Sequence, residues 1–241
     1  MREIFDRVEE FGITKIETEV DIDIEKEKKL YPWLFSVFIK VDAKDENSAG
    51  FENFLETKES LIIALEYEAR AIYAGMRVVD GWSELYFYAK ESKNLDSVVS
   101  NMLRDNYYKY ETSVVKDTKW DFYHKNLSPS DLEFLNIESS KIIFLLKEEG
   151  DDLSIAREVE HYASFDTATQ KDRFIQKALD NGFRFKDDIS SEEFEHGVAL
   201  VKEHNLMQES VDSIIKELYD LAKSEHGYYE LWSTTLAQEA K

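Results

Sequence analysis

The sequence contains no cysteine, and this absence excludes several kinds of chemistry. Disulfide bonds, a thiolate nucleophile and a cysteine-ligated metal all need a residue that the 241-residue chain lacks. The best apolar run, residues 142–146, is far shorter than the roughly 20 residues that cross a bilayer. The charged residues 1–10 have no apolar core and do not resemble a signal peptide. We therefore expect a cytoplasmic protein without a membrane segment.

Glycine-rich phosphate loops and nucleophile elbows are also missing from the sequence. The five histidines form no two-histidine helical motif, and His196 and His204 would lie about 26 Å apart on one strand. His161 is expected to pack among aromatic side chains. The sequence therefore predicts no catalytic residue, no cofactor and no metal.

What the chain has in excess is acid, with 51 acidic against 30 basic residues and a net charge of −21. Residues 150–241 alone contain 20 acidic and 10 basic residues. Such a field repels phosphate backbones, which argues against direct binding of nucleic acid, and it favours a basic protein partner. The alternative is that the excess of acid only keeps the protein soluble.

A hydrophobic content of 43% is that of a globular chain, and its periodicity predicts alternating helices and strands. The Asp80-Gly81 pair predicts a two-residue hairpin turn. Helices are expected at 1–11, 51–73, 94–104, 131–149, 167–180 and 208–225. Strands are expected at 15–24, 33–41, 76–79, 82–89, 107–116, 155–163, 183–189, 194–204 and 228–236.

The order strand–helix–strand–strand–helix–strand occurs twice in this set, at 33–123 and after 150. This order predicts an α+β protein of two tandem ferredoxin-like α/β sandwiches, each an antiparallel sheet with helices on one face. We expect a first domain at 1–129, a connector helix at 130–149 and a second domain at 150–241.

The second half carries a set of short motifs in a fixed order. An apolar helix end leads into Glu148-Glu149-Gly150-Asp151-Asp152, and Val159-Glu160-His161-Tyr162 follows. A helix then ends at Asn181-Gly182-Phe183, and residues 211–222 lead into 228–234. As an ordered set these motifs resemble RraB, the bacterial regulator of ribonuclease E activity. The resemblance implies a ferredoxin-like domain that binds ribonuclease E and inhibits RNA cleavage.

The first half, from about residue 33 to 129, resembles the bacterial domain-of-unknown-function family 695. Residues 75–79, Gly81 and 85–88 carry part of this resemblance. The most specific piece is the run from Asp117 to Tyr123, Asp-Thr-Lys-Trp-Asp-Phe-Tyr. The family has no established activity, although it occurs joined to RraB-like domains.

The charge, the resemblance and the missing catalytic groups together predict a non-enzymatic regulator that binds a basic protein, with a ribonuclease as the candidate. We expect its contact patch at Asp151, Asp152, Glu158 and Glu160. The two aspartates are expected in an exposed turn, and the two glutamates alternate onto one strand face, where carboxylates can pair with guanidinium groups. The alternative is an enzyme or ligand-binding protein with Asp121, His124 or His161 lining a cleft between the domains.

Overall fold

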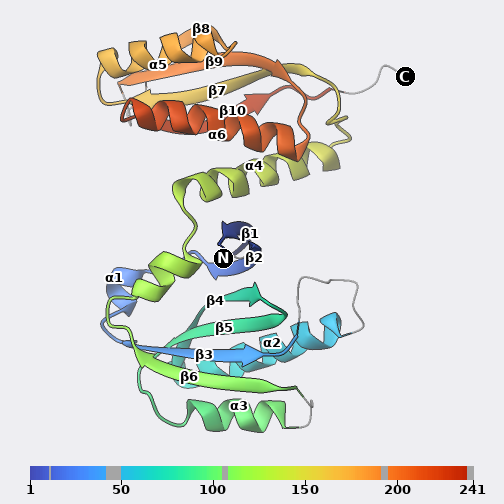
Figure 1. Ribbon diagram of the computed structural model, residues 1–241, viewed down its shortest axis with the longest axis vertical. Helices are drawn as coiled ribbons and strands as arrows, with labels where there is room; N and C mark the ends of the chain where they lie inside the picture. The colour runs from blue at the N-terminus through green and yellow to red at the C-terminus, as the bar shows by residue number, and fades with distance from the viewer. Residues whose placement is uncertain (11, 42–49, 105–107, 191–194, 238–241) are drawn as a thin grey trace. The chain divides into compact units, whose positions relative to one another are not determined.

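The computed structural model describes residues 1–10, 12–41, 50–104, 108–190 and 195–237 (Figure 1). The chain divides into two compact units, Met1–Ser128 and Pro129–Lys241. Both contain an antiparallel sheet and helices, so the predicted α+β class with two domains is confirmed. None of the helices within the described ranges combines the length and the apolar composition that spanning a membrane requires.

The first unit contains a six-stranded sheet in the order β1-β2-β4-β5-β3-β6. The run β3-α2-β4-β5-α3-β6 has the ferredoxin-like order, and the β1–β2 hairpin extends the sheet beyond β4. The strands are β1 (Arg2–Glu9), β2 (Gly12–Glu19), β3 (Trp33–Ile39), β4 (Ala71–Val79), β5 (Trp82–Ala89) and β6 (Tyr110–Lys116). The helical segments are α1 (Ile24–Glu27), α2 (Phe51–Glu66), η1 (Tyr67–Ala69), α3 (Leu95–Leu103) and η2 (Tyr123–Leu127).

Both faces of this first sheet are covered. On one face α2 and α3 pack on apolar side chains of β3, β4 and β5. On the other face a smaller core forms around Trp120, which is fully buried, stacks on Tyr88 with ring centroids 3.8 Å apart, and donates from Nε1 to the Tyr31 carbonyl at 2.9 Å. The motif from Asp117 to Tyr123 therefore closes the second face of the sheet.

The second unit contains a four-stranded sheet in the ferredoxin-like order β10-β7-β9-β8. Its strands are β7 (Arg157–Phe165), β8 (Arg184–Ile189), β9 (His196–His204) and β10 (Tyr228–Thr234). Its helices are α4 (Asp131–Glu148), α5 (Ala168–Asp180) and α6 (Gln208–Ser224). All three helices contribute to one core with the inward side chains of the sheet.

The helix at 130–149 corresponds to α4, which is packed as part of the second unit. Leu135 and Ile143 belong to its core, and the buried Trp232 of β10 donates from Nε1 to Ser139 Oγ at 2.7 Å. Lys223 of α6 forms an ion pair with Asp131 at 2.9 Å. The start of α4 is defined by Ser130, which forms a capping box with Glu133.

The expected helix at 1–11 is wrong, because these residues form β1. Every residue from Arg2 to Glu9 pairs with β2, and Ile4 and Val8, two of the apolar residues taken for a helix face, are 57% and 85% exposed. In a segment this short, pairing with the neighbouring strand decides the secondary structure, although the apolar residues have a helical spacing. The expected helix at 51–73 also ends too late: α2 stops at Glu66, and β4 begins at Ala71.

A buried ion pair attaches the β1–β2 hairpin to the rest of the first unit. Glu17 of β2 accepts from Lys58 Nζ of α2 at 2.6 Å and from the Tyr73 hydroxyl of β4 at 2.9 Å, and all three side chains are buried. Burial, together with the carboxylate of Glu17, raises the pKa of Tyr73 well above its usual value. Tyr73 therefore remains a neutral donor, and both oxygens of Glu17 have partners.

We predict that Gly75→Ala destabilises the first unit by about 2 kcal/mol or more, because a methyl group has no room there. Gly75 lies at an irregularity in the β4–β5 pairing, and a Cβ atom at this position would be 2.4 Å from the Glu17 carbonyl oxygen. Urea unfolding measures the loss. Gly50→Ala is the matched control, since a Cβ there meets nothing within 4 Å. Equal midpoints for the two variants would contradict the close approach.

We also predict that residues 129–241 unfold in one cooperative transition when expressed alone, because this range contains its own core. Residues 150–241 should be far less stable, because that fragment lacks Leu135, Ile143 and the acceptor of Trp232. Thermal unfolding followed by near-ultraviolet circular dichroism compares the two. A stable 150–241 fragment would show that α4 is only a connector.

Candidate protein-binding face

Strand β7 separates two kinds of side chain, because alternate residues of a strand point to opposite faces of the sheet. Val159, His161 and Ala163 are almost fully buried on the side covered by the helices. Glu158 and Glu160 point to the other side, as predicted, together with Tyr162 and Ser164. This other side, which the helices of the second unit leave uncovered, is called the open face below.

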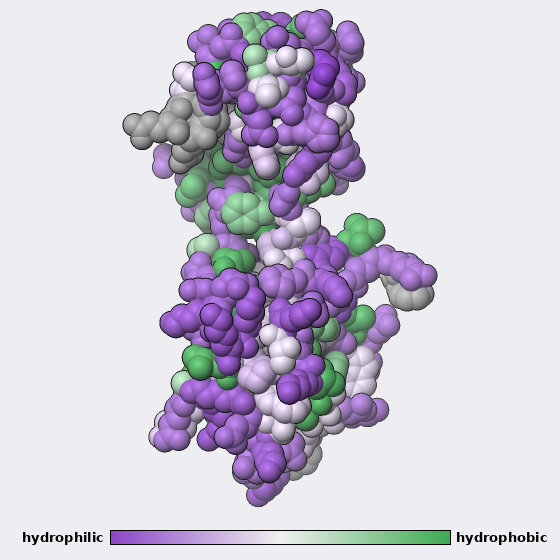
Figure 2. All heavy atoms as spheres, turned by 90° about the vertical axis from the view of Figure 1, so that its left-hand side faces the viewer, coloured by the Kyte–Doolittle hydropathy of each residue, from purple (hydrophilic) through white to green (hydrophobic). Residues whose placement is uncertain are grey.

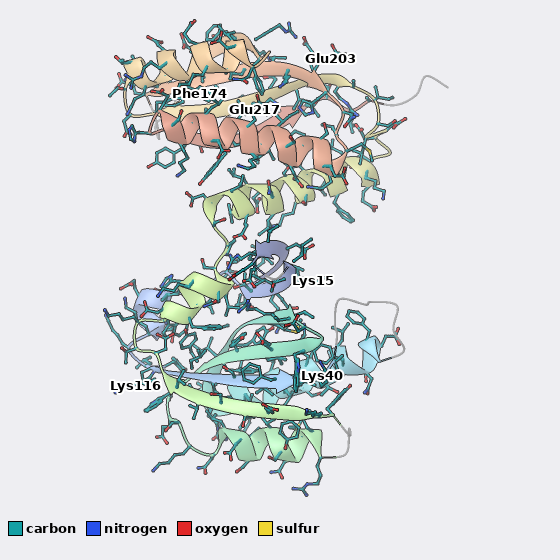
Figure 3. All side chains as sticks on the ribbon, viewed as in Figure 1. Lys15, Lys40, Lys116, Phe174, Glu203 and Glu217 are labelled. Carbon is teal, nitrogen blue, oxygen red and sulfur yellow. The ribbon has the colours of Figure 1, made fainter. Side chains whose placement is uncertain are left out.

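The neighbouring strands supply the rest of the open face through their register. On β9, Ala199 and Val201 lie opposite Tyr162 and Glu160, and both are buried. Glu203 lies opposite Glu158 and is labelled on β9 in Figure 3. The open face thus has a small apolar centre with charged residues around it. Its charged residues are Glu158, Glu160, Asp187, Glu203 and Glu230 with Arg184 and Lys186.

Two ion pairs link β7 to the edge strand β8 across this face. Glu158 pairs with Arg184 and Glu160 with Lys186. The bond to Lys186 lowers the pKa of Glu160 below its usual value, and Tyr162, which donates to Glu160 at 3.1 Å, adds to this effect. Glu160 is therefore an ionised acceptor at neutral pH. The side chains of Glu158 and Arg184 are each 65% exposed, so water and other solutes reach this pair.

The prediction that Asp151 lies exposed in a turn is wrong. Its side chain is buried and accepts a two-pronged pair of bonds from the Arg157 guanidinium, at 2.6 and 2.7 Å. The same guanidinium donates to the carbonyls of Asp152 and Thr235, and the backbone N–H of Ala237 donates to Asp151. The Arg157 bond lowers the pKa of Asp151. Asp151 therefore holds the turn before β7 against the segment after β10.

Asp152 lies at the surface, and its carboxylate stabilises the turn that contains it. Its Oδ1 accepts from the backbone N–H of Ser154 at 3.0 Å and from the Ser154 hydroxyl at 2.6 Å. These bonds lower its pKa. The residues of the predicted patch therefore do not share one role. Glu158 and Glu160 lie together on the open face, whereas the carboxylate of Asp151 is buried and paired with Arg157.

The residues of the alternative site, Asp121, His124 and His161, differ in their exposure. Asp121 and His124 are exposed residues of the first unit, whereas His161 is 1% exposed in the interior of the second. As expected, His161 packs among aromatic rings, with Phe183 and Tyr229 beside it. Among the described residues, no group of three or more histidine, aspartate and glutamate side chains could hold a metal ion.

A buried hydrogen-bonded chain around His161 was not predicted from the sequence. His161 Nε2 lies 3.2 Å from His204 Nε2, and His161 Nδ1 lies 2.9 Å from the Tyr229 hydroxyl. His204 Nδ1 donates to the Asn205 carbonyl at 2.7 Å, which leaves its Nε2 as an acceptor. His161 must then donate from Nε2 and accept from Tyr229. With both histidines neutral, every member of this chain has a partner.

The pKa values follow from this burial. Burial, with contributions from His204 and Lys202, lowers the pKa of His161 from 6.5 to about 3. Burial also lowers the pKa of His204 and raises that of Tyr229. The network is therefore a neutral structural element at physiological pH.

Two family models match the chain. Residues 136–234 match the model described as regulator of ribonuclease activity B, RraB. Residues 6–128 match the model described as a family of unknown function, DUF695. Both resemblances that the sequence indicates are confirmed, and each match lies within one of the two compact units. The comparison with curated proteins found no match.

We predict that the second unit loses stability as the pH falls below 6.5, because the unfolded chain binds a proton at His161 that the folded chain excludes down to about pH 3. This histidine alone should cost about 2 kcal/mol at pH 5. His161→Gln retains a donor for His204 and an acceptor for Tyr229 but does not titrate. It should lose less stability than the parent chain between pH 7 and pH 5.

Urea unfolding at the two pH values measures this difference. His196→Gln is the control, because it removes a histidine of β9, the strand of His204, that lies outside the network. It should retain the pH dependence of the parent chain. A pH dependence of His161→Gln equal to that of the parent would contradict the buried neutral state.

Proposed function

The chain belongs to the DUF695 family, its second unit matches the RraB family, and from these two facts we propose that the protein is a non-enzymatic regulator that binds a ribonuclease of the ribonuclease E type. The RraB match is the observation that carries the proposal. A regulator of this kind acts by occupying a surface of its target and needs no catalytic group. The partner's contact surface would be basic, because the second unit presents an excess of carboxylates.

We assign the contact to the open face of the second unit. Five acidic and two basic side chains surround its apolar centre, which leaves a net negative face. Figure 2 shows hydrophilic side chains over most of the surface on the side in view, with apolar groups in small areas. A charged surface of this kind speeds encounter with an oppositely charged partner more than it adds affinity.

The two internal ion pairs make the assignment specific. An arginine of the partner must compete with Arg184 for Glu158, or with Lys186 for Glu160. Removing the internal cations should therefore strengthen binding, whereas reversing the glutamates should weaken it. A surface that binds through uncharged contacts would not respond in opposite directions to these two changes. Binding through total charge alone would, and a control pair on the covered side separates that case.

We predict that Glu158→Lys with Glu160→Lys weakens capture of the native host's ribonuclease E by about tenfold at low salt. Arg184→Gln with Lys186→Gln should strengthen the same capture. Biolayer interferometry at 50 and 300 mM salt measures both, and the difference should shrink at the higher salt because screening shortens the range of the charges. The cleavage rate of a model RNA by the ribonuclease should follow the same order.

The control pair is Asp172→Lys with Asp180→Lys on α5, which changes the net charge by the same amount on exposed residues of the covered side. It should bind like the parent chain. If the control weakens capture as much as the glutamate pair, the interaction depends only on total charge and the open face is not the site. If the parent chain does not bind the ribonuclease, the proposed partner is wrong.

A further inference from the structure

A pocket of about 500 Å³ lies in the first unit and plays no part in the proposed function. Three segments form it: the end of η1, the chain after β5 and one side of α3. Figure 1 shows these segments meeting at one end of the six-stranded sheet, where β4 begins and β5 ends. Lys90 N–H donates to the Arg70 carbonyl at 3.1 Å, so two of the segments are joined directly. A pocket of this size holds a small molecule.

The charge of this pocket is opposite to that of the chain. Arg70, Lys90 and Lys93 line it, in a protein whose net charge is −21. Within the described ranges none of these three side chains has a carboxylate at ion-pair distance. Arg70 is half-buried, and Lys90 and Lys93 are exposed at the rim of the pocket. Lys90 Nζ lies over the Tyr31 ring, 5.3 Å from its centroid, but no carboxylate of the described residues neutralises any of the three cations, so this concave surface can attract an anion.

One side of α3 adds neutral hydrogen-bonding groups. Asn94, Ser97 and Asn101 line the pocket at helical spacing, with Val98 between them. The Asn94 side chain does not cap α3, so its amide is available to a ligand. Glu68 and Glu91 also line the pocket, and they can accept from hydroxyl or amino groups. The ligand should therefore carry an anionic end and a hydrogen-bond-donating end.

The backbone at this pocket is held in unfavourable conformations. Glu68 and Ala69 have φ angles of 56° and 52°, and Asn94 has 63°. Left-handed conformations are rare for residues other than glycine, and such residues gather at ligand sites. The Tyr31 hydroxyl donates to the Ala69 carbonyl at 3.2 Å and holds this segment in place. The segment that carries Arg70 is thus anchored to Tyr31 beside the pocket.

We propose that this pocket binds a small phosphate monoester of sugar-phosphate or nucleotide size. Arg70 presents a planar guanidinium that matches phosphate oxygens in a two-pronged arrangement, and Lys90 and Lys93 add compact charges. Asn94, Ser97 and the two glutamates contact the hydroxyl groups of the ligand. A phosphate dianion neutralises the cations, whereas the glutamates disfavour a bare polyanion such as RNA.

Nuclear magnetic resonance of the ¹⁵N-labelled full chain tests the proposal, with ribose 5-phosphate, inorganic phosphate and RNA of 12 nucleotides as probes at fixed ionic strength. Ribose 5-phosphate should shift the amide signals of Asn94, Ser97 and Asn101 in a saturable manner, and more tightly than inorganic phosphate. Arg70→Gln, Lys90→Gln and Lys93→Gln combined should weaken binding at least tenfold without changing the melting temperature. The control removes three exposed lysines of the same unit elsewhere: Lys29→Gln, Lys119→Gln and Lys125→Gln.

The control variant should bind ribose 5-phosphate within twofold of the parent chain. No saturable shift with either phosphate probe would overturn the proposal, as would equal weakening by the two triple variants. RNA that binds these residues more tightly than ribose 5-phosphate would overturn the small-molecule assignment.

Discussion

The register of β7 is the constraint on which the second unit depends. This strand is hydrogen-bonded on both sides, to β9 over its whole length and to β10 over most of it. Because side chains alternate between the faces, a shift by one residue would place Glu158 and Glu160 in the core and expose Val159 and His161. The acidic face and the buried histidine network are therefore two sides of one pairing. Neither can change without the other.

The local pattern of the sequence predicts the direction of the side chains correctly where one face of a strand is buried. Apolar and polar residues alternate in β7, so the shared direction of its two glutamates was predicted correctly. The Asp80-Gly81 turn between β4 and β5 was equally clear. Asp151 was misjudged because aspartate favours turns, exposed or not. Its burial comes from Arg157 and from backbone groups beyond β10, which are distant in sequence.

Long-range contacts account for the other differences. A helical spacing at residues 1–11 was misleading because a short segment cannot reveal that β2 will pair with it along its full length. His161 and His204 were considered separately, since their contact depends on how β7 and β9 pair and twist. The cations of the pocket come from two connecting segments that the sheet brings together, and no sequence spacing indicates this.

The bonds around Asp151 have a mechanical meaning as well as a structural one. Asp152 N–H donates to the Ala237 carbonyl at 3.0 Å, and Ala237 N–H donates to Asp151 at 2.9 Å, so the chain enters and leaves the four-stranded sheet at the same point. A force that pulls Asp152 and Ala237 apart would break these two hydrogen bonds before it acted on the strands.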